Sequence, residues 1–177
     1  MKLTEDYKYK SIRKTAEVLA ELIDAAIPED FGSSGGSSRS FDDEVVTNGV
    51  EVIVIPLPTI SKHIRERGFD HMWLIAKELA KRRGWKAQKI LSRINKTVQV
   101  GADEETRKKQ AKGAYAVVGG RGFGKSAAPH TLLDSTKTYL LVDDVWTTGA
   151  SMEAAIKIIK KAGAVRVASA VILMPPE

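Results

Sequence analysis

The chain has 177 residues, of which 43% are hydrophobic and 28% charged, and its 28 Lys and Arg against 22 Asp and Glu give a formal net charge of +6. This composition predicts one domain, residues 1–177, that buries roughly 70% of the surface of the unfolded chain. The lack of cysteine excludes disulfides and cysteine-based metal sites. No stretch approaches the roughly 18 apolar residues of a membrane span, and the first residues are too polar for a signal peptide, so we expect a soluble cytoplasmic protein without a membrane partner.

The first predicted element is an amphipathic helix from about Ser11 to Ala26, because its apolar residues recur along one side. Pro28 follows this helix. The next segment, FGSSGGSSRS, has three glycines and five serines in ten residues. This composition is typical of a flexible loop, here 32–40, which is either native or an engineered replacement. We assign no function to it.

The middle of the chain predicts a buried strand followed by a helix. The run VEVIVIPLP, from Val50, is continuous and β-branched, as in a strand of a parallel sheet buried on both faces. A basic loop, SKHIRERGFDH, follows it. Asp70 is expected to cap the next helix, which ends in KRR with Gly84 beyond. Short strands are predicted at Lys89–Ile94 and in AYAVV, and a loop over 119–130.

The last third of the chain has the clearest pattern, TYLLVDDVWTTGASMEAAIKIIKKAGAVRVASAVIL. It predicts a strand, a polar turn, a helix that ends at Gly163 and a second strand, which together form a βαβ unit. Such units build an α/β fold with a mainly parallel, twisted sheet flanked by helices. Ligands of these sheets bind at the carboxyl ends of the strands.

Chemistry-bearing residues gather at the carboxyl end of the strand Tyr139–Val142. Asp143 and Asp144 come first, and Thr147 to Ser151 lead into the helix. Small residues and a glycine at a helix N-terminus suit a phosphate, which backbone amides and hydroxyls can bind. Adjacent carboxylates suit sugar hydroxyls. The combination points to ribose 5-phosphate, although Thr-Thr-Gly alone is equally typical of a helix start with no ligand.

The string LLVDDVWTTGAS resembles the phosphoribosyl pyrophosphate (PRPP) motif of type I phosphoribosyltransferases. The resemblance implies the type I phosphoribosyltransferase fold, with Asp143 and Asp144 as the catalytic pair that holds the ribose 2′- and 3′-hydroxyls. It further implies that the 5-phosphate is bound by the residues that follow. The PRPP-binding residues predicted in this way are Asp143, Asp144, Val145, Thr147, Thr148, Gly149, Ala150 and Ser151. Thr147 stands where the branch acting on 6-oxopurines has a general-base aspartate, which argues against that branch.

The order of motifs along nearly the whole chain resembles the ComF-like (competence protein F) branch of this family, which reads V-P-V-P, R-G-F-N-Q, T-x-x-Q and R-x-x-N-x-x-G-A-F. Arg67, Gly68, Gln99 and Arg107 match these motifs. Asp70, His71 and Gln110 depart from them. A strand ending at Pro58 would bring the following basic residues to the same sheet edge, where guanidinium groups suit a pyrophosphate. The predicted pyrophosphate contacts are Pro58, Lys62, Arg65 and Arg67.

The resemblance implies transfer of ribose 5-phosphate from PRPP to a nitrogen nucleophile, an unidentified nucleobase or amine, with release of pyrophosphate. Mg²⁺ is the expected cofactor, held mainly by PRPP and water rather than by protein ligands. No side chain stands out as a general acid or base, so catalysis would rest on positioning and electrostatics. A homodimer and contacts with competence proteins stay open.

Two other interpretations compete with this one. Residues 119–126, GGRGFGKS, formally satisfy the P-loop pattern, but Pro129 and the short distance to Asp143 do not suit that fold. Alternatively, the protein is a non-catalytic ComF-like factor of DNA uptake that binds PRPP or single-stranded DNA. Its basic clusters, Lys81-Arg82-Arg83 and Arg107-Lys108-Lys109, would then contact phosphates, or they are only solvated surface.

Overall fold

Four parallel strands form the main sheet, in the order β2-β1-β5-β6. The computed structural model describes residues 2–32, 49–94, 114–118, 133–146 and 148–173. The strands of the sheet are β1 (Val52–Pro56), β2 (Lys86–Ala87), β5 (Thr138–Val145) and β6 (Arg166–Leu173). The helices are α1 (Lys2–Ala26), α2 (Ser61–Arg67), α3 (His71–Arg83) and α5 (Ala150–Lys161). Two further strands, β3 (Leu91–Arg93) and β4 (Tyr115–Val117), pair antiparallel to each other. The α/β fold with a parallel sheet and flanking helices, predicted from the sequence, is confirmed.

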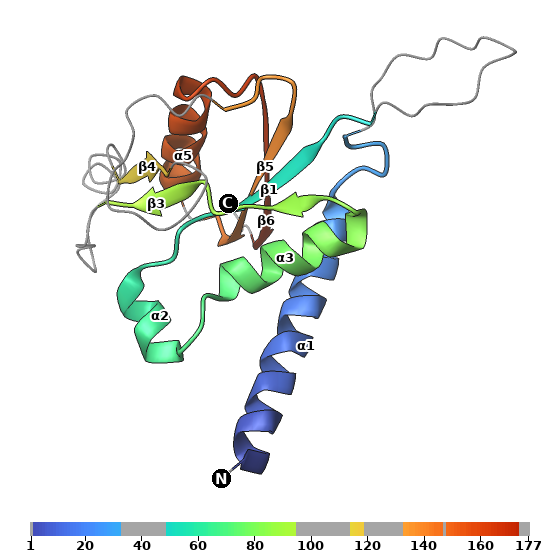
Figure 1. Ribbon diagram of the computed structural model, residues 1–177, viewed down its shortest axis with the longest axis vertical. Coiled ribbons are helices and arrows are strands. Elements are labelled where there is room, and N and C mark those ends of the chain that lie inside the picture. Colours follow the sequence, from blue (N-terminus) through green and yellow to red (C-terminus); the bar gives the residue numbers. More distant parts are fainter. Residues whose placement is uncertain (1, 33–48, 95–113, 119–132, 147, 174–177) are drawn as a thin grey trace, which may run out of the picture.

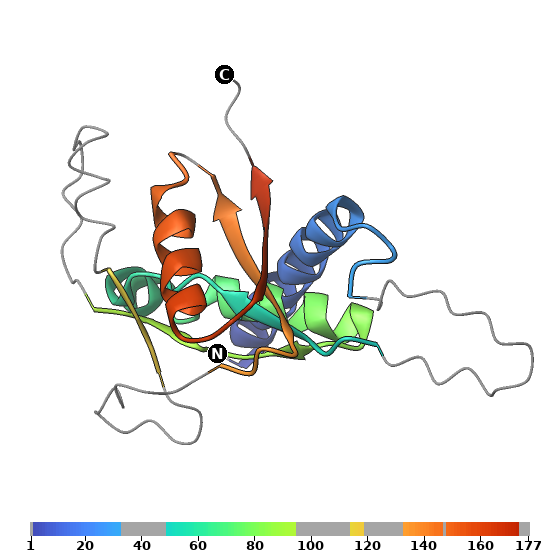
Figure 2. The same ribbon diagram turned by 90° about the horizontal axis from the view of Figure 1, so that it is seen from above.

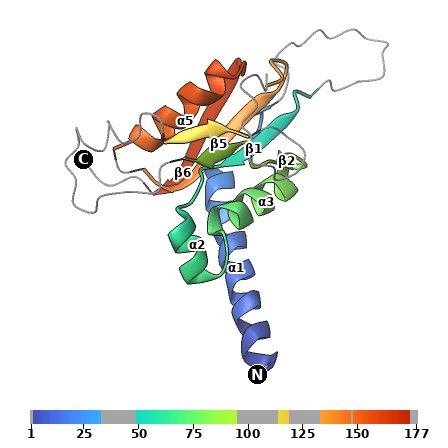
Figure 3. The same cartoon turned by 60° about the vertical axis from the view of Figure 1, so that its left-hand side comes forward.

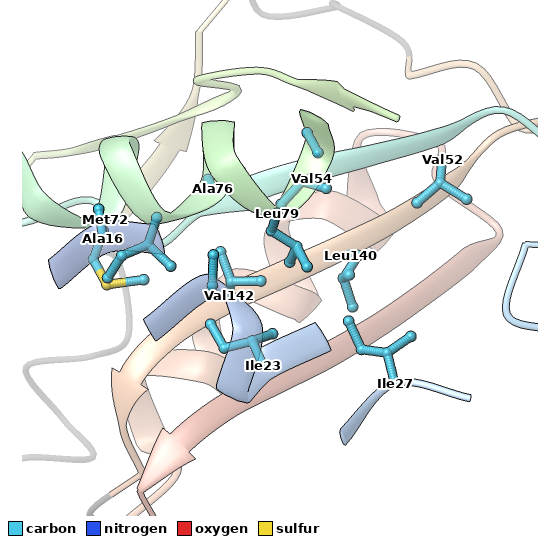
Figure 4. Close-up of a cluster of buried hydrophobic side chains, with 13 residues drawn as sticks. Ala16, Ile23, Ile27, Val52, Val54, Met72, Ala76, Leu79, Leu140 and Val142 are labelled. Carbon is cyan, nitrogen blue, oxygen red and sulfur yellow. The ribbon is translucent and has the colours of Figure 1, made fainter. Parts of the chain in front are cut away.

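The central strands are buried on both faces, as their continuous apolar runs predict. Val52 and Val54 belong to a core cluster on one face, which also contains Leu140 and Val142 of β5 (Figure 4). Ile53 and Ile55 alternate with them and join a second cluster on the opposite face. Because successive side chains of a strand point to opposite faces, one short run fills two cores. Burying one side chain of this size stabilises the folded state by about 1.5–3 kcal/mol.

The helices lie in two layers, one on each side of the sheet (Figures 1 and 2). Helices α1 and α3 cover the first cluster, to which they contribute Ile23 and Leu79. Helix α5 and the β3–β4 pair cover the second, to which α5 contributes Met152, Ala155 and Ile159. Strands β5 and β6 are parallel neighbours joined through α5, so the predicted βαβ unit is confirmed.

Helix α1 is longer than its apolar pattern indicates, since it begins at Lys2 rather than near Ser11. The segment 2–10 contains no glycine or proline and is polar, so a helix is compatible with it although no apolar stripe announces one. Its N-terminal half extends away from the sheet (Figure 3). None of the described helices is long and apolar enough to cross a membrane.

The segment after β1 is a helix and not the predicted loop. Helix α2 begins at Ser61, after Pro58, and ends where Gly68 takes the left-handed conformation, with φ 81°. The other local predictions here are confirmed: Asp70 caps α3 by accepting a hydrogen bond from the Trp73 backbone nitrogen at 3.2 Å, and Gly84 ends that helix. The loop predicted at 32–40 and the one at 119–130 lie outside the described residues, apart from Gly32.

Candidate active site

The register of the sheet brings the ends of β1 and β5 together. Pro56 pairs with Val142, and the backbone nitrogen of Leu57 donates to the Val142 carbonyl oxygen at 2.9 Å. Parallel strands have their carboxyl ends at one edge. The residues that follow β1 therefore lie beside Asp143 and Asp144, the last polar residues of β5.

A cavity of about 180 Å³ opens at this edge and is lined by residues of both sheets and of three helices, α2, α3 and α5. The predicted residues in its wall are Pro58, Arg67, Asp143, Asp144 and Ser151. The sequence-based prediction missed several others. These are Leu57, Thr59, Ile60, His63, His71, Met72, Arg93 and Tyr115.

The two carboxylates have opposite electrostatic surroundings. Burial raises the pKa of Asp143 to about 7, and the neighbouring charge of Asp144 adds to this effect. In contrast, a hydrogen bond from His71 holds the pKa of Asp144 below its ordinary value. Near pH 7 Asp144 is therefore ionised, whereas Asp143 is protonated in only part of the molecules. Carboxylates in this state accept hydrogen bonds readily from the hydroxyls of a sugar.

His71 connects the acid pair to the basic segment after β1. Its Nε2 lies 3.0 Å from Asp144 Oδ2, and its Nδ1 lies 3.0 Å from Arg67 Nη1. His71 is the first residue of α3, directly after the capping Asp70, which also binds Lys89 Nζ at 2.7 Å. Asp70 and His71 both depart from the R-G-F-N-Q motif, and the structure gives them different roles: Asp70 caps a helix and His71 faces the cavity.

The predicted phosphate-binding turn forms a second, smaller hollow of about 40 Å³ next to the first. Asp143, Val145, Trp146, Gly149 and Ser151 contribute to its wall. Gly149 has φ 72° and precedes the first turn of α5, where its carbonyl oxygen accepts from the Glu153 backbone nitrogen. The N-terminal amides of α5 therefore face the side of the site that carries the acid pair. Thr148 is half-buried and Ala150 buried, while Thr147 lies outside the described residues.

Helical periodicity separates the predicted pyrophosphate contacts. Arg67 lines the cavity together with His63, four residues before it. Lys62 instead pairs with Glu66 at 3.7 Å on an exposed side of α2, and neither Lys62 nor Arg65 belongs to the cavity wall. Residues four apart lie on the same face of a helix, so His63 and Arg67 face the cavity together while Lys62 and Glu66 lie on another side. The predicted loop gave no basis for separating these residues. Of the three predicted basic contacts, Arg67 is thus the one that the structure brings to the cavity with the acid pair, and Pro58 lies in the same wall.

The β3–β4 pair contributes Arg93 and Tyr115 to the wall of the cavity. The guanidinium of Arg93 lies 5.7 Å from the ring centre of Tyr115, and its buried Nε has no hydrogen-bond partner among the described residues. Burial raises the pKa of Tyr115, so its hydroxyl stays protonated over the physiological range. An unpaired guanidinium nitrogen in a polar cavity suits an anionic ligand.

The described residues bear on parts of the two competing interpretations. Strand β4, which precedes the P-loop-like 119–126, belongs to the antiparallel pair and not to the parallel sheet in which a P-loop strand lies. The segment itself lies outside the described residues, as do Gln99, Gln110 and the cluster Arg107-Lys108-Lys109. In the other basic cluster, Arg82 and Arg83 both bind Asp24 of α1, and so hold α1 against α3.

The chain is similar to a known protein family and to several solved structures. A family model described as "Phosphoribosyl transferase domain" matches residues 77–177, a range that contains the acid pair and the turn before α5. A search of curated protein sequences found no match.

Three solved structures are similar to the chain at low identity. One, described as the allosteric regulatory enzyme of purine biosynthesis, is 15% identical over 90% of this chain and 26% of that chain, with a TM-score of 0.47. A glutamine PRPP amidotransferase from B. subtilis, complexed with ADP and GMP, is 14% identical over 92% of this chain and 27% of that chain, with a TM-score of 0.48. A hypoxanthine phosphoribosyltransferase from Staphylococcus aureus is 10% identical over 93% and 65%, with a TM-score of 0.45. The chain thus spans about a quarter of the first two proteins and 65% of the third.

Proposed function

The chain belongs to the phosphoribosyl transferase domain family, and we propose that it binds PRPP and transfers ribose 5-phosphate to a nitrogen nucleophile. One observation carries this proposal: Asp143 and Asp144, near the carboxyl end of β5, line the same cavity as Ser151 in the first turn of α5 and Arg67 of α2. Two carboxylates, a phosphate-binding turn and a guanidinium thus meet at one sheet edge. These groups match the hydroxyls, the 5-phosphate and the pyrophosphate of PRPP, respectively.

Each group has a defined task in the proposed reaction. Asp143 and Asp144 accept hydrogen bonds from the ribose hydroxyls, and the negative charge of Asp144 stabilises the positive charge that develops at C1 in the transition state. The amides and hydroxyls from Thr148 to Ser151 bind the 5-phosphate and so fix C1 in place. Arg67 stabilises the leaving pyrophosphate. The bond from C1 to the pyrophosphate oxygen breaks, the bond from C1 to the acceptor nitrogen forms, and the acceptor loses a proton to solvent.

Mg²⁺ fits this site as an ion that arrives with the substrate. The described residues contain no group of three or more His, Cys, Asp or Glu that could form a protein cage for a metal. Mg²⁺ commonly keeps its waters and binds phosphate oxygens together with one or two carboxylates at most. PRPP oxygens and water would therefore hold the ion here, and it would neutralise charge on the pyrophosphate.

Binding of PRPP can be tested by thermal unfolding. With Mg²⁺ and PRPP at 100 times the Kd, mass action stabilises the folded protein by about 2.7 kcal/mol, which raises the Tm by about 5–10 °C. We expect Asp144→Asn to abolish this rise. Glu66→Gln is the matched control, because it removes a carboxylate from the exposed side of α2 and should leave the rise unchanged. An equal rise in wild type and Asp144→Asn would place PRPP elsewhere.

The acceptor defines the biological role, and the order of motifs along the chain supports a ComF-like member of the family. A screen of nucleobases and ammonia for pyrophosphate release from PRPP tests catalysis directly. A protein that binds PRPP but releases no pyrophosphate with any acceptor would support the non-catalytic alternative. Salt-dependent binding of single-stranded oligonucleotides in a gel shift would then test its role in DNA uptake.

A further inference from the structure

Three polar side chains from three separate elements form a continuous hydrogen-bonded line into the cavity. Arg67 is the last residue of α2, His71 is the first of α3, and Asp144 lies near the end of β5. The two contacts, Arg67 Nη1 to His71 Nδ1 and His71 Nε2 to Asp144 Oδ2, are both 3.0 Å. The His71 side chain is 21% exposed, so most of it is removed from solvent. The line thus joins the predicted pyrophosphate contact to the predicted ribose contact.

The donors and acceptors in this line allow only one arrangement of protons. Arg67 can only donate, so His71 Nδ1 must accept and carries no proton. The proton of the neutral ring is therefore on Nε2, which donates to the Asp144 carboxylate. A doubly protonated ring would direct an N–H at the Arg67 guanidinium and break that contact. Arg67 therefore fixes the tautomer of His71.

We propose that His71 is a positioning residue for Asp144 and couples it to Arg67. The inference rests on the proposed function, since it concerns how the same site recognises PRPP. His71 occupies one oxygen of Asp144, which fixes the plane of the carboxylate and leaves the other oxygen to accept from a ribose hydroxyl. Because Arg67 sets the donor on the opposite side of the ring, a change at either end of the line alters the other.

Two substitutions separate this role from simple packing. His71→Gln retains the line, because the amide oxygen can accept from Arg67 while the amide nitrogen donates to Asp144. His71→Leu removes both hydrogen bonds at a similar volume. A hydrogen bond to a charged group changes affinity by about tenfold to a hundredfold. We expect that loss in His71→Leu for both PRPP and ribose 5-phosphate, since both ligands have the ribose hydroxyls, and near wild-type affinity in His71→Gln.

Arg67→Ala provides the complementary pattern. It removes the predicted pyrophosphate contact directly and the orientation of Asp144 only through His71. The loss of PRPP affinity should therefore exceed the loss of ribose 5-phosphate affinity, whereas His71→Leu should affect the two ligands equally. Equal affinity of His71→Leu and wild type for both ligands would overturn the inference.

The tautomer can be measured on the unmodified protein, so the test does not depend on the folding of a variant. The chain has three histidines, and the ring signals of His71 in ¹⁵N-histidine-labelled protein are those missing from His71→Gln. We expect a neutral ring with its proton on Nε2 in the absence of ligand. A proton on Nδ1, or averaging between the two tautomers, would overturn the inference. If the wild type has the proton on Nε2 but binds neither ligand, the proposed function is wrong, and so is the positioning role that rests on it. If the wild type binds the ligands but has the proton on Nδ1, only the positioning role is wrong and the proposed function stands.

Discussion

Gly149 allows a sharp test of the turn that leads into α5. Its φ of 72° lies in the left-handed region, where a residue with a Cβ costs about 1 kcal/mol. A Cβ built at this position would also lie 2.4 Å from Trp146 Cζ2 and 2.8 Å from Cε2. Because the Trp146 ring packs against the core cluster around α5, the ring must move, and such overpacking costs about 1–3 kcal/mol. Gly149→Ala should therefore destabilise the protein by about 2–4 kcal/mol.

Gly84 is the matched control for this substitution. Its φ of 67° is similar, but a Cβ there would meet nothing within 4 Å. Gly84→Ala should thus cost only the conformational part, about 1 kcal/mol. At about 2–4 °C per kcal/mol, the Tm should fall by about 4–16 °C for Gly149→Ala and by about 2–4 °C for Gly84→Ala.

Two measurements decide whether the contact with Trp146 causes the larger destabilisation by Gly149→Ala. Urea unfolding gives the free energies, and a double-mutant cycle with Trp146→Ala should remove the excess cost of Gly149→Ala. Gly149→Ala should also lose the Tm rise with Mg²⁺ and PRPP, which Gly84→Ala should keep. Equal destabilisation by the two alanines, or an excess that persists without Trp146, would refute the reasoning.

Two further predictions concern charge. Because the folded pKa of Asp143 is about 7 against an ordinary 3.8, the folded state binds the extra proton between these values, so this residue makes the protein less stable as pH rises from about 4 to 7. Asp143→Asn should therefore raise the free energy of unfolding by roughly 1–3 kcal/mol at pH 8 and change it little at pH 4, as measured by urea unfolding. An equal increase at both pH values would contradict the raised pKa of Asp143. Arg83 binds the Asp24 carboxylate and the Asp24, Ile27 and Pro28 carbonyl oxygens, so Arg83→Ala should cost about 2–4 kcal/mol. The more exposed Arg82 is the control, and Arg82→Ala should cost less than about 1 kcal/mol in the same assay; similar costs would show that the carbonyl contacts contribute little.

Local patterns were sufficient where neighbours in sequence are also neighbours in space. The β5–α5–β6 unit, the cap at Asp70 and the position of Asp143 and Asp144 at a strand end follow from periodicity and turn chemistry, and the structure has all three. The start of α1 was misjudged because a polar helix shows no apolar stripe. Helix α2 stands where the sequence predicts a loop, because its seven residues include only one apolar side chain, Ile64, and so have no periodic signal of their own.

His71, Arg93 and Tyr115 could not be recognised as site residues from their own surroundings in the sequence. His71 and Asp144 are 73 positions apart, and their contact depends on how α3 packs on the sheet. Arg93 and Tyr115 lie side by side in the cavity wall because β3 and β4 pair with these two residues as partners. The available signal for His71 was its place in the segment Arg67–His71, which resembles the R-G-F-N-Q motif.

The sequence by itself determined the α/β class, the βαβ unit and the place of the acid pair between a strand and a helix, because strand and helix periodicities and turn residues are local signals. Only the tertiary structure decided which basic residue faces that pair. Arg67 lines the cavity while Lys62 turns outward, because the face that a helix presents is set by its packing. The tertiary structure likewise decided that the pKa of Asp143 lies above its ordinary value and that of Asp144 below it, since burial raises the first and the hydrogen bond from His71 lowers the second.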